Sequence, residues 1–199
     1  MTGPLLATVL AVGVAQGAPA SEPGAVATRR TLEPKPIAGW SVVELRGGLT
    51  THGDAGATFC GQVSPWRTIS IEACGSGAGF WDGRSAVTEM VHFRLEGRVP
   101  VWSKGGAELS VEPGVGFAEI EQGADAPGFR FGAATSPDQR EGAGPEATVG
   151  LKARVWPHAR VFATTELSGG AALVPSAPTV TGQQGPLVPF VLWTVGAGF

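Results

Sequence analysis

The fold class follows from residues 86–101, which read AVTEMVHFRLEGRVPV. The side chains of this stretch alternate between apolar and polar with a period of two. The apolar set shares one face: Val87, Val91, Phe93, Leu95, Val99 and Val101. The polar set shares the opposite face: Thr88, His92, Arg94, Glu96 and Arg98. A period of two is that of a β-strand, whereas a helix would spread these charges over every side. We therefore predict a long strand with one apolar and one charged face.

Similar alternation continues along the chain on both sides of this stretch. The other predicted strands are residues 40–50, 57–63, 67–80, 107–120, 147–155, 161–167 and 187–199. The predicted short turns are residues 64–66, 103–105 and 156–158, and the predicted longer loops are residues 51–56, 81–85, 121–144 and 172–186. Because successive strands run in opposite directions, both termini and all short turns fall at one end of the sheet. This arrangement predicts an all-β, up-and-down antiparallel transmembrane β-barrel of about eight strands.

The composition favours strands and turns over helices. Of the 199 residues, 31 are Gly and 16 are Pro, and 16% are charged. The net charge of −3 gives no reason to expect a nucleic-acid partner. His52, His92 and His158 are far apart in the sequence, so we expect no metal site and no cofactor.

The segment that most resembles an apolar helix lies at the N-terminus. Residues 5–14 read LLATVLAVGV and are followed by small residues. This stretch is shorter than the ~20 apolar residues that span a bilayer, but it matches the apolar region of a signal peptide. We therefore expect residues 1–20 to be a signal peptide, residues 21–39 to be an irregular periplasmic leader, and residues 40–199 to be the barrel.

Alternation alone does not tell whether the apolar face points into a soluble barrel or outward to lipid. The tryptophans beside the predicted short turns favour lipid: Trp40, Trp66, Trp102 and Trp156. An aromatic girdle at a membrane interface has this position, whereas core aromatics would not gather at one end of the strands. We expect the apolar face to meet lipid. The alternative is a secreted soluble barrel that binds an apolar ligand inside.

The opposite face of the strands then lines a narrow lumen. It carries charged groups of both signs: Glu44, Arg46, Glu72, His92, Arg94, Glu96, Arg98, Glu108, Glu112, Lys152, Arg154 and Glu166. We expect a salt-bridge network that closes the lumen, because about eight strands leave room for little beyond side chains. Arg94 and Arg98 should lie beside Glu108 and Glu112 on the neighbouring strand. The alternative is a narrow channel or transporter for small solutes.

Cys60 and Cys74 are the only cysteines of the chain. Both fall on the polar face of neighbouring predicted strands. An exported protein meets an oxidising compartment, where an even number of cysteines pairs readily. We therefore expect a disulfide bond between these two residues.

The C-terminal residues 193–199 read WTVGAGF, with apolar residues at alternate positions and a final phenylalanine. In this ending and in the pattern of residues 40–199, the chain resembles the family of small outer-membrane β-barrel proteins of Gram-negative bacteria. The resemblance implies an outer-membrane location and an assembly signal at Trp193, Val195 and Phe199 that the barrel-assembly machinery reads during insertion. It also implies contact with outer-membrane lipid and lipopolysaccharide. We expect the barrel to be a monomer.

The sequence argues against an enzyme. Some small outer-membrane barrels resemble lipid A deacylases, which use a His and a Ser two residues apart on one strand face. No Ser lies two residues after His92 or His52. We therefore expect no catalytic residue and a structural or surface-interacting role, with recognition by the long loop of residues 121–144.

Overall fold

The computed structural model describes residues 42–199, with gaps at residues 53–55, 77–87, 124–128 and 159. The expected signal peptide and leader, Trp40 and the loop of residues 81–85 lie outside the described residues. The described strands are β1 (Val42–Thr50), β2 (Ala57–Trp66), β3 (Ile69–Gly75), β4 (Thr88–Gly97), β5 (Val99–Lys104), β6 (Ala107–Gln122), β7 (Glu141–His158), β8 (Val161–Leu173) and β9 (Leu187–Gly198). A short helix, α2 (Ala177–Thr181), lies between β8 and β9. No helix in this part of the chain is both long and apolar enough to cross a membrane.

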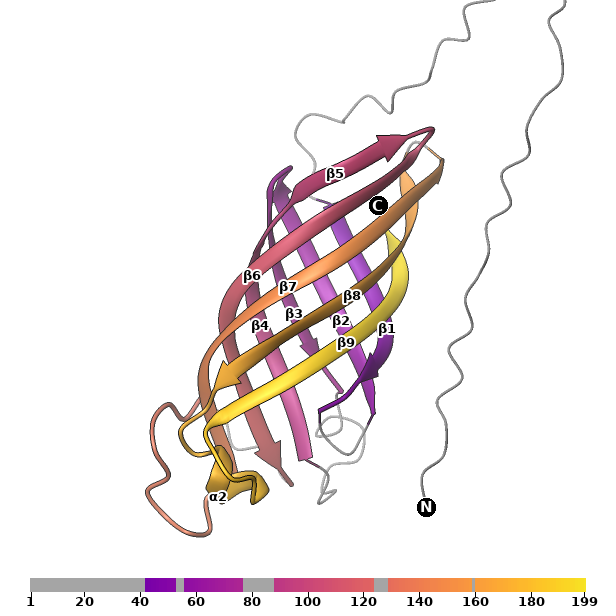
Figure 1. The fold of residues 1–199 in the computed structure, drawn as a ribbon. Helices are drawn as coiled ribbons and strands as arrows, with labels where there is room; N and C mark the ends of the chain where they lie inside the picture. The colour runs from indigo at the N-terminus through magenta and orange to yellow at the C-terminus, as the bar shows by residue number, and fades with distance from the viewer. Residues whose placement is uncertain (1–41, 53–55, 77–87, 124–128, 159) are drawn as a thin grey trace, which may run out of the picture. The chain divides into compact units, whose positions relative to one another are not determined.

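The strands form one antiparallel sheet that closes on itself (Figure 1). The order around the sheet is β4-β3-β2-β1-β9-β8-β7-β6-β5, and a pairing of β4 with β6 closes the ring. Because β4 and β5 both pair with β6, they are two halves of one wall strand that is interrupted at Arg98. By the register of the flanking pairs, Arg98 lies opposite Glu112, and the preceding Gly97 lies opposite Pro113, whose nitrogen has no hydrogen to donate. The wall therefore has eight strands, and the prediction of an all-β, up-and-down antiparallel barrel is confirmed.

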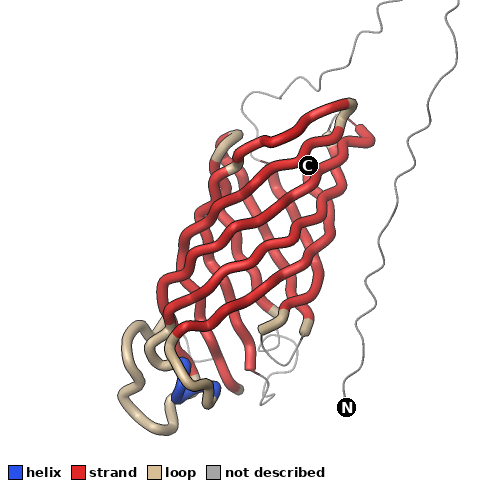
Figure 2. The backbone as a smooth tube through the Cα atoms, viewed as in Figure 1, coloured by secondary structure: helices blue, strands red, loops and turns tan. Residues whose placement is uncertain are grey.

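Short turns at residues 67–68 and 105–106, and a turn at Arg160, connect the strands at one end of the barrel, which we call the short-turn end (Figure 2). The other connections leave the barrel at the opposite end, which we call the loop end. The predicted turns at residues 64–66 and 156–158 are wrong, because these residues belong to β2 and β7. Each of them contains a proline, at a register shift between the paired strands. The proline therefore bends the strand at an irregularity instead of ending it.

Two other boundaries differ from the prediction. The turn expected at residues 103–105 falls at Gly105 and Gly106, whose φ angles of 61° and 82° suit a tight hairpin turn. Strand β7 begins at Glu141 instead of residue 147, and β8 ends at Leu173 instead of residue 167. These extensions contain many Gly and Ala residues, whose small side chains give no alternation of apolar and polar groups. The backbone pairing between the strands nevertheless continues through them.

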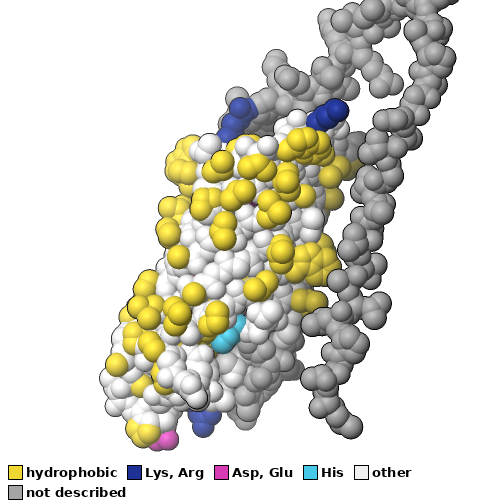
Figure 3. Space-filling view, viewed as in Figure 1, with side chains coloured by type: hydrophobic (Ala, Val, Ile, Leu, Met, Phe, Trp, Pro, Cys, Tyr) yellow, Lys and Arg dark blue, Asp and Glu magenta, His cyan; other side chains and the backbone are white. Residues whose placement is uncertain are grey.

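The wall turns its apolar side chains outward and its charged side chains inward. Leu45, Trp66 and Val115 are 62–65% exposed on the outer face. Glu44 and Lys152, at inward positions of β1 and β7, are at most 1% exposed. Figure 3 shows apolar side chains spread along the wall, with charged side chains near its two ends. This distribution is the reverse of that in a soluble protein and fits a wall solvated by lipid.

The interior of the barrel is apolar at the loop end. Its apolar plug consists of buried side chains from the strands, α2 and the segment before α2: Met90, Ala118, Ile120, Ala172, Val174, Ala177, Val180, Val188, Phe190 and Leu192. Helix α2 supplies Ala177 and Val180, so it closes this end of the lumen. The alternation does not reveal the plug, because this part of β9 is apolar on both faces.

The barrel is so narrow that some inward positions accept only glycine. A Cβ atom on Gly196 of β9 would lie 2.0 Å from the backbone oxygen of Leu45 on β1. A Cβ atom on Gly116 of β6 would lie 1.9 Å from the backbone oxygen of Phe93 on β4. Both distances are far below van der Waals contact. These glycines therefore allow neighbouring strands to curve tightly around the lumen.

We expect Gly196→Ala to destabilise the barrel by about 1–3 kcal/mol, because the added methyl group forces the backbone of β1 to move. Gly61→Ala is the matched control, since its Cβ atom would lie 3.9 Å from the nearest atom, on the side chain of Leu45. The measurement is the urea concentration at which the folded band is lost from an unheated gel. Equal stability of the two variants would show that the barrel tolerates a side chain at the close approach of β9 and β1.

Candidate functional site

The charged lumen is organised around Lys152, which projects inward from β7 and is fully buried. Its Nζ atom lies 2.7 Å from Oε2 of Glu112 and 2.8 Å from Oε2 of Glu166. It also donates a 2.7 Å hydrogen bond to Oε1 of Gln62 and lies 3.9 Å from Oε2 of Glu44. One ammonium group thus joins carboxylates and an amide from β1, β2, β6 and β8.

Two arginines extend this network on either side of Lys152. Arg46 on β1 forms ion pairs with Glu72 and Glu166, which come from β3 and β8. Arg154 on β7 lies 2.9 Å from Oε1 of Glu44 and 2.7 Å from Oε1 of Glu112. Each guanidinium therefore bridges two carboxylates from different strands, which satisfies charges that burial alone would make unfavourable.

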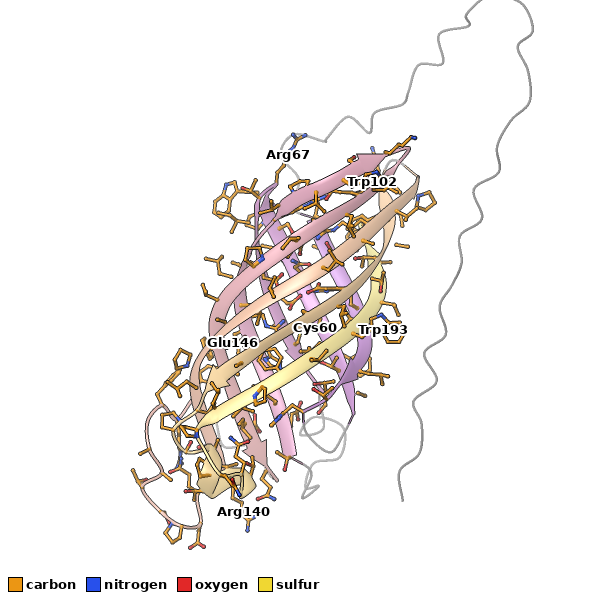
Figure 4. All side chains as sticks on the ribbon, viewed as in Figure 1. Cys60, Arg67, Trp102, Arg140, Glu146 and Trp193 are labelled. Atoms are coloured by element: carbon orange, nitrogen blue, oxygen red, sulfur yellow. A yellow bond between two sulfur atoms is a disulfide. The ribbon has the colours of Figure 1, made fainter. Side chains whose placement is uncertain are left out.

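A second group of ion pairs lies where the charged lumen meets the apolar plug. Arg94 on β4 lies 3.1 Å from Glu72 and 3.0 Å from Glu146. Nδ1 of His92 lies 2.7 Å from Oε2 of the same Glu146, and the imidazole ring packs on Phe190 with centroids 4.4 Å apart. Figure 4 marks Glu146 on the wall. Glu146 was not among the predicted residues, although it has the same strand parity as Lys152, because the predicted strand began one residue later.

The expected pairing with the carboxylates of β6 is confirmed for Arg98 and wrong for Arg94. Arg94 faces Gly116 on β6, four residues beyond Glu112, so it reaches to β3 and β7 instead. Arg98 pairs with Glu108, and both side chains are partly exposed near the short-turn end. Glu112 is already bound by cations of β7. In a narrow lumen, partners come from across the interior as well as from the adjacent hairpin strand.

Glu96 differs from the other lumen carboxylates. Its Oε2 atom accepts a 2.8 Å hydrogen bond from Nε2 of Gln62, and no cation lies within ion-pair distance among the described residues. Carboxylate oxygens of Glu72, Glu96 and Glu166 lie within 4.8 Å of one another. Glu72 and Glu166 are both occupied by Arg46, so these oxygens serve ion pairs.

Cys60 and Cys74 are joined by a disulfide bond and are directly paired residues of β2 and β3. Both are buried, at 4% and 2% exposure, and both face the lumen. Cys74 is also the register partner of His92 on β4. The disulfide therefore lies in the layer between the ion pairs and the apolar plug, and Figure 4 marks Cys60 at this level.

The residues predicted for the aromatic girdle and the assembly signal lie on the outer wall or at its short-turn end. Trp66 and Trp102 are 65% and 50% exposed at the short-turn end. Trp156 differs from them: it has the inward strand parity of Lys152 and Arg154, it is half-buried, and its ring lies 5.4 Å from that of the buried Phe162. On the final strand, the residues of the expected assembly signal all point outward: Trp193, Val195 and Phe199.

The long loop after β6 folds back onto the outer wall at the loop end. Phe129 and Phe131 pack on Phe117 of β6 with ring centroids 4.9 and 5.7 Å apart. The backbone oxygen of Arg130 accepts a hydrogen bond from the amide of Ala143, which is fully buried. The described part of the loop therefore presents an aromatic surface beside the barrel.

We expect Lys152→Met to destabilise the barrel by about 3–5 kcal/mol, because it strips several buried carboxylates of a shared cation. The measurement is equilibrium unfolding from lipid vesicles. Adding Glu112→Gln to Lys152→Met should recover part of the loss, since one uncompensated carboxylate is removed. Arg98→Met is the matched control near the rim and should have a smaller effect. Equal and small losses of stability in Lys152→Met and Arg98→Met would show that the ion-pair network does not stabilise the barrel.

We expect the disulfide of the folded barrel to resist a water-soluble reductant, because ion pairs cover it on one side and the apolar plug on the other. Alkylation followed by mass measurement should detect no free thiol in the folded protein and two after denaturation and reduction. Loss of the bond should lower stability by about 3 kcal/mol. Rapid alkylation of both cysteines in the folded, reductant-treated protein would contradict the sealed position.

No protein-family model matches the chain, and no curated protein sequence matches it. Among solved structures, the barrel is similar to Neisserial surface protein A, with a TM-score of 0.52 at 6% identity over 81% of this chain and 96% of that one. It also matches the N-terminal β-barrel domain of Pseudomonas aeruginosa OprF, with a TM-score of 0.43 at 12% identity over 80% and 95% of the two chains. For Ail of Yersinia pestis the TM-score is 0.39 at 8% identity, over 79% and 94%. The first of these likenesses shows the fold: the chain has the fold of the small, eight-stranded outer-membrane β-barrel proteins.

Proposed function

We propose that this protein is a non-enzymatic outer-membrane barrel with a closed lumen, which holds its loop end at the cell surface for structural or recognition roles. The observation that carries the proposal is the reversal of polarity across the wall. Outward side chains such as Leu45 and Val115 are apolar and exposed, while inward ones such as Lys152 are charged and buried. In water this arrangement would expose the apolar wall and bury charges, so lipid is the solvent that fits it. The interior is also too polar for the alternative of a soluble barrel with an apolar ligand.

Two successive barriers support a closed lumen. The ion pairs around Lys152, Arg46 and Arg154 fill the middle of the barrel with buried side chains. Beyond them, an ion would have to cross the apolar plug, which includes Ile120 and Phe190. Moving a charge through an apolar layer without partners is strongly unfavourable. The plug therefore argues against the alternative of a narrow channel.

The position of His92 supports a non-enzymatic role. This side chain is 1% exposed and lies between Glu146 and Phe190 inside the barrel. A lipid substrate would approach from the outer wall, on the other side of the strand. The His92–Glu146 pair therefore acts in packing and hydrogen bonding within the lumen.

The proposal includes an orientation and a set of partners. The short-turn end faces the periplasm, and the loop end lies among lipopolysaccharide molecules, as short periplasmic turns and longer outer loops are usual for such barrels. The barrel-assembly machinery recognises the final strand through outward Trp193, Val195 and Phe199. The surface at residues 129–140, with the aromatic cluster beside it, is the region offered for recognition by a barrel that acts as a monomer.

We expect the purified protein to show no large, steady conductance in a planar bilayer, because both barriers must open together to pass an ion. Extraction from membranes should require detergent, and the folded form should migrate differently from the heated form on a gel. An open porin of known conductance is the positive control for the bilayer. If the wild type conducts steadily and Arg98→Ala changes the ion selectivity, the closed lumen is wrong and the protein is a narrow channel.

A further inference from the structure

The charged groups outside the lumen are unevenly distributed between the two ends of the barrel. At the short-turn end the described residues include exposed Arg67, Lys104 and Arg160, and no carboxylate side chain outside the lumen network. At the loop end they include cations and a larger number of carboxylates: Arg130, Arg140, Glu89, Glu119, Glu121, Asp138 and Glu141. Counted over the described residues outside the lumen, the two ends therefore carry opposite net charge.

The cations of the short-turn end are placed one to a turn. Arg67 lies in the turn between β2 and β3, Lys104 ends β5 before the next turn, and Arg160 lies in the turn between β7 and β8. These turns are distributed around the barrel mouth, so the charges encircle the rim and do not form one flat patch (Figure 1). Such a ring suits several small, separate anions better than one large acidic surface.

None of these three cations has an ion-pair partner within the part of the chain that the structure describes. At the loop end, by contrast, Arg130 is bound to Glu141. Figure 4 shows Arg67 projecting away from the end of the barrel, above the wall. The charge of the short-turn end is therefore available to a ligand outside the protein.

Exposed tryptophans set the depth of this ring. Trp66 directly precedes Arg67, and Trp102 lies two residues before Lys104. Both indole rings are at least half exposed on the outer wall. Tryptophan prefers the boundary between acyl chains and headgroups, and one or two strand residues beyond it span about 3–7 Å. Long cationic side chains at that height reach the level of lipid phosphates.

We propose that the short-turn end is a binding surface for the headgroups of anionic phospholipids, with Arg67, Lys104 and Arg160 contacting phosphate and Trp66 and Trp102 fixing the depth. This inference rests on the proposed membrane barrel and names the lipid that one of its ends selects. The negative loop end is repelled by the same headgroups. Anionic lipid on the periplasmic side therefore holds the barrel in one orientation and at one height.

The test uses the full barrel folded into vesicles of phosphatidylcholine alone or mixed with phosphatidylglycerol. Equilibrium unfolding by urea is compared for the wild type, Arg67→Gln and the matched control Arg140→Gln, each of which replaces one exposed arginine at one end. In the mixed vesicles, Arg67→Gln should lower the folding equilibrium constant about fivefold, which is the effect of one cation near an anionic surface. The triple variant with Lys104→Gln and Arg160→Gln should lose about a hundredfold.

In phosphatidylcholine alone, all these variants should match the wild type, and high salt should remove the differences in mixed vesicles. Equal responses of Arg67→Gln and Arg140→Gln to phosphatidylglycerol would overturn the inference while leaving the membrane barrel intact. Failure of the wild type to insert into either kind of vesicle would instead overturn the proposed function, and the lipid surface with it.

Discussion

A lipid bilayer offers no hydrogen-bond partner to a strand edge, and the rest of this structure depends on that constraint. A sheet that crosses the bilayer must close, because each unpaired backbone group in hydrocarbon is strongly unfavourable. Here the pairing of β4 with β6 completes the ring. Closure with eight strands leaves a narrow interior, so strands approach closely at Gly116 and Gly196 and inward side chains meet across the lumen.

The narrow interior explains why the lumen is organised in layers. Charges placed there have little water to solvate them, so each needs a partner within reach. Lys152 and Arg46 meet this need by contacting groups from several strands, which also ties distant parts of the wall together. The disulfide between Cys60 and Cys74 forms the next layer, and the apolar plug closes the loop end. Stability and closure thus come from the same side chains.

Sequence patterns predicted the strands well wherever charged and apolar residues alternated. They failed at Pro65 and Pro157, which read as turns but lie at register shifts inside β2 and β7. They also missed Glu146, because the Gly- and Ala-rich start of β7 carries little alternation. In each case the ladder of backbone hydrogen bonds continues through residues whose side chains give no strong signal.

The sequence by itself determined which side chains share each face of a strand, because strand parity depends only on a period of two along the chain. It also determined that the strands are about eight in number and antiparallel, so that all short turns lie at one end. Only the tertiary structure decided which charges meet across the lumen: Arg94 pairs with Glu72 and Glu146, and Glu112 with Lys152 and Arg154. Those pairings depend on the curvature of the wall and on the reach of long side chains across the lumen, neither of which is encoded in the spacing of residues along one strand.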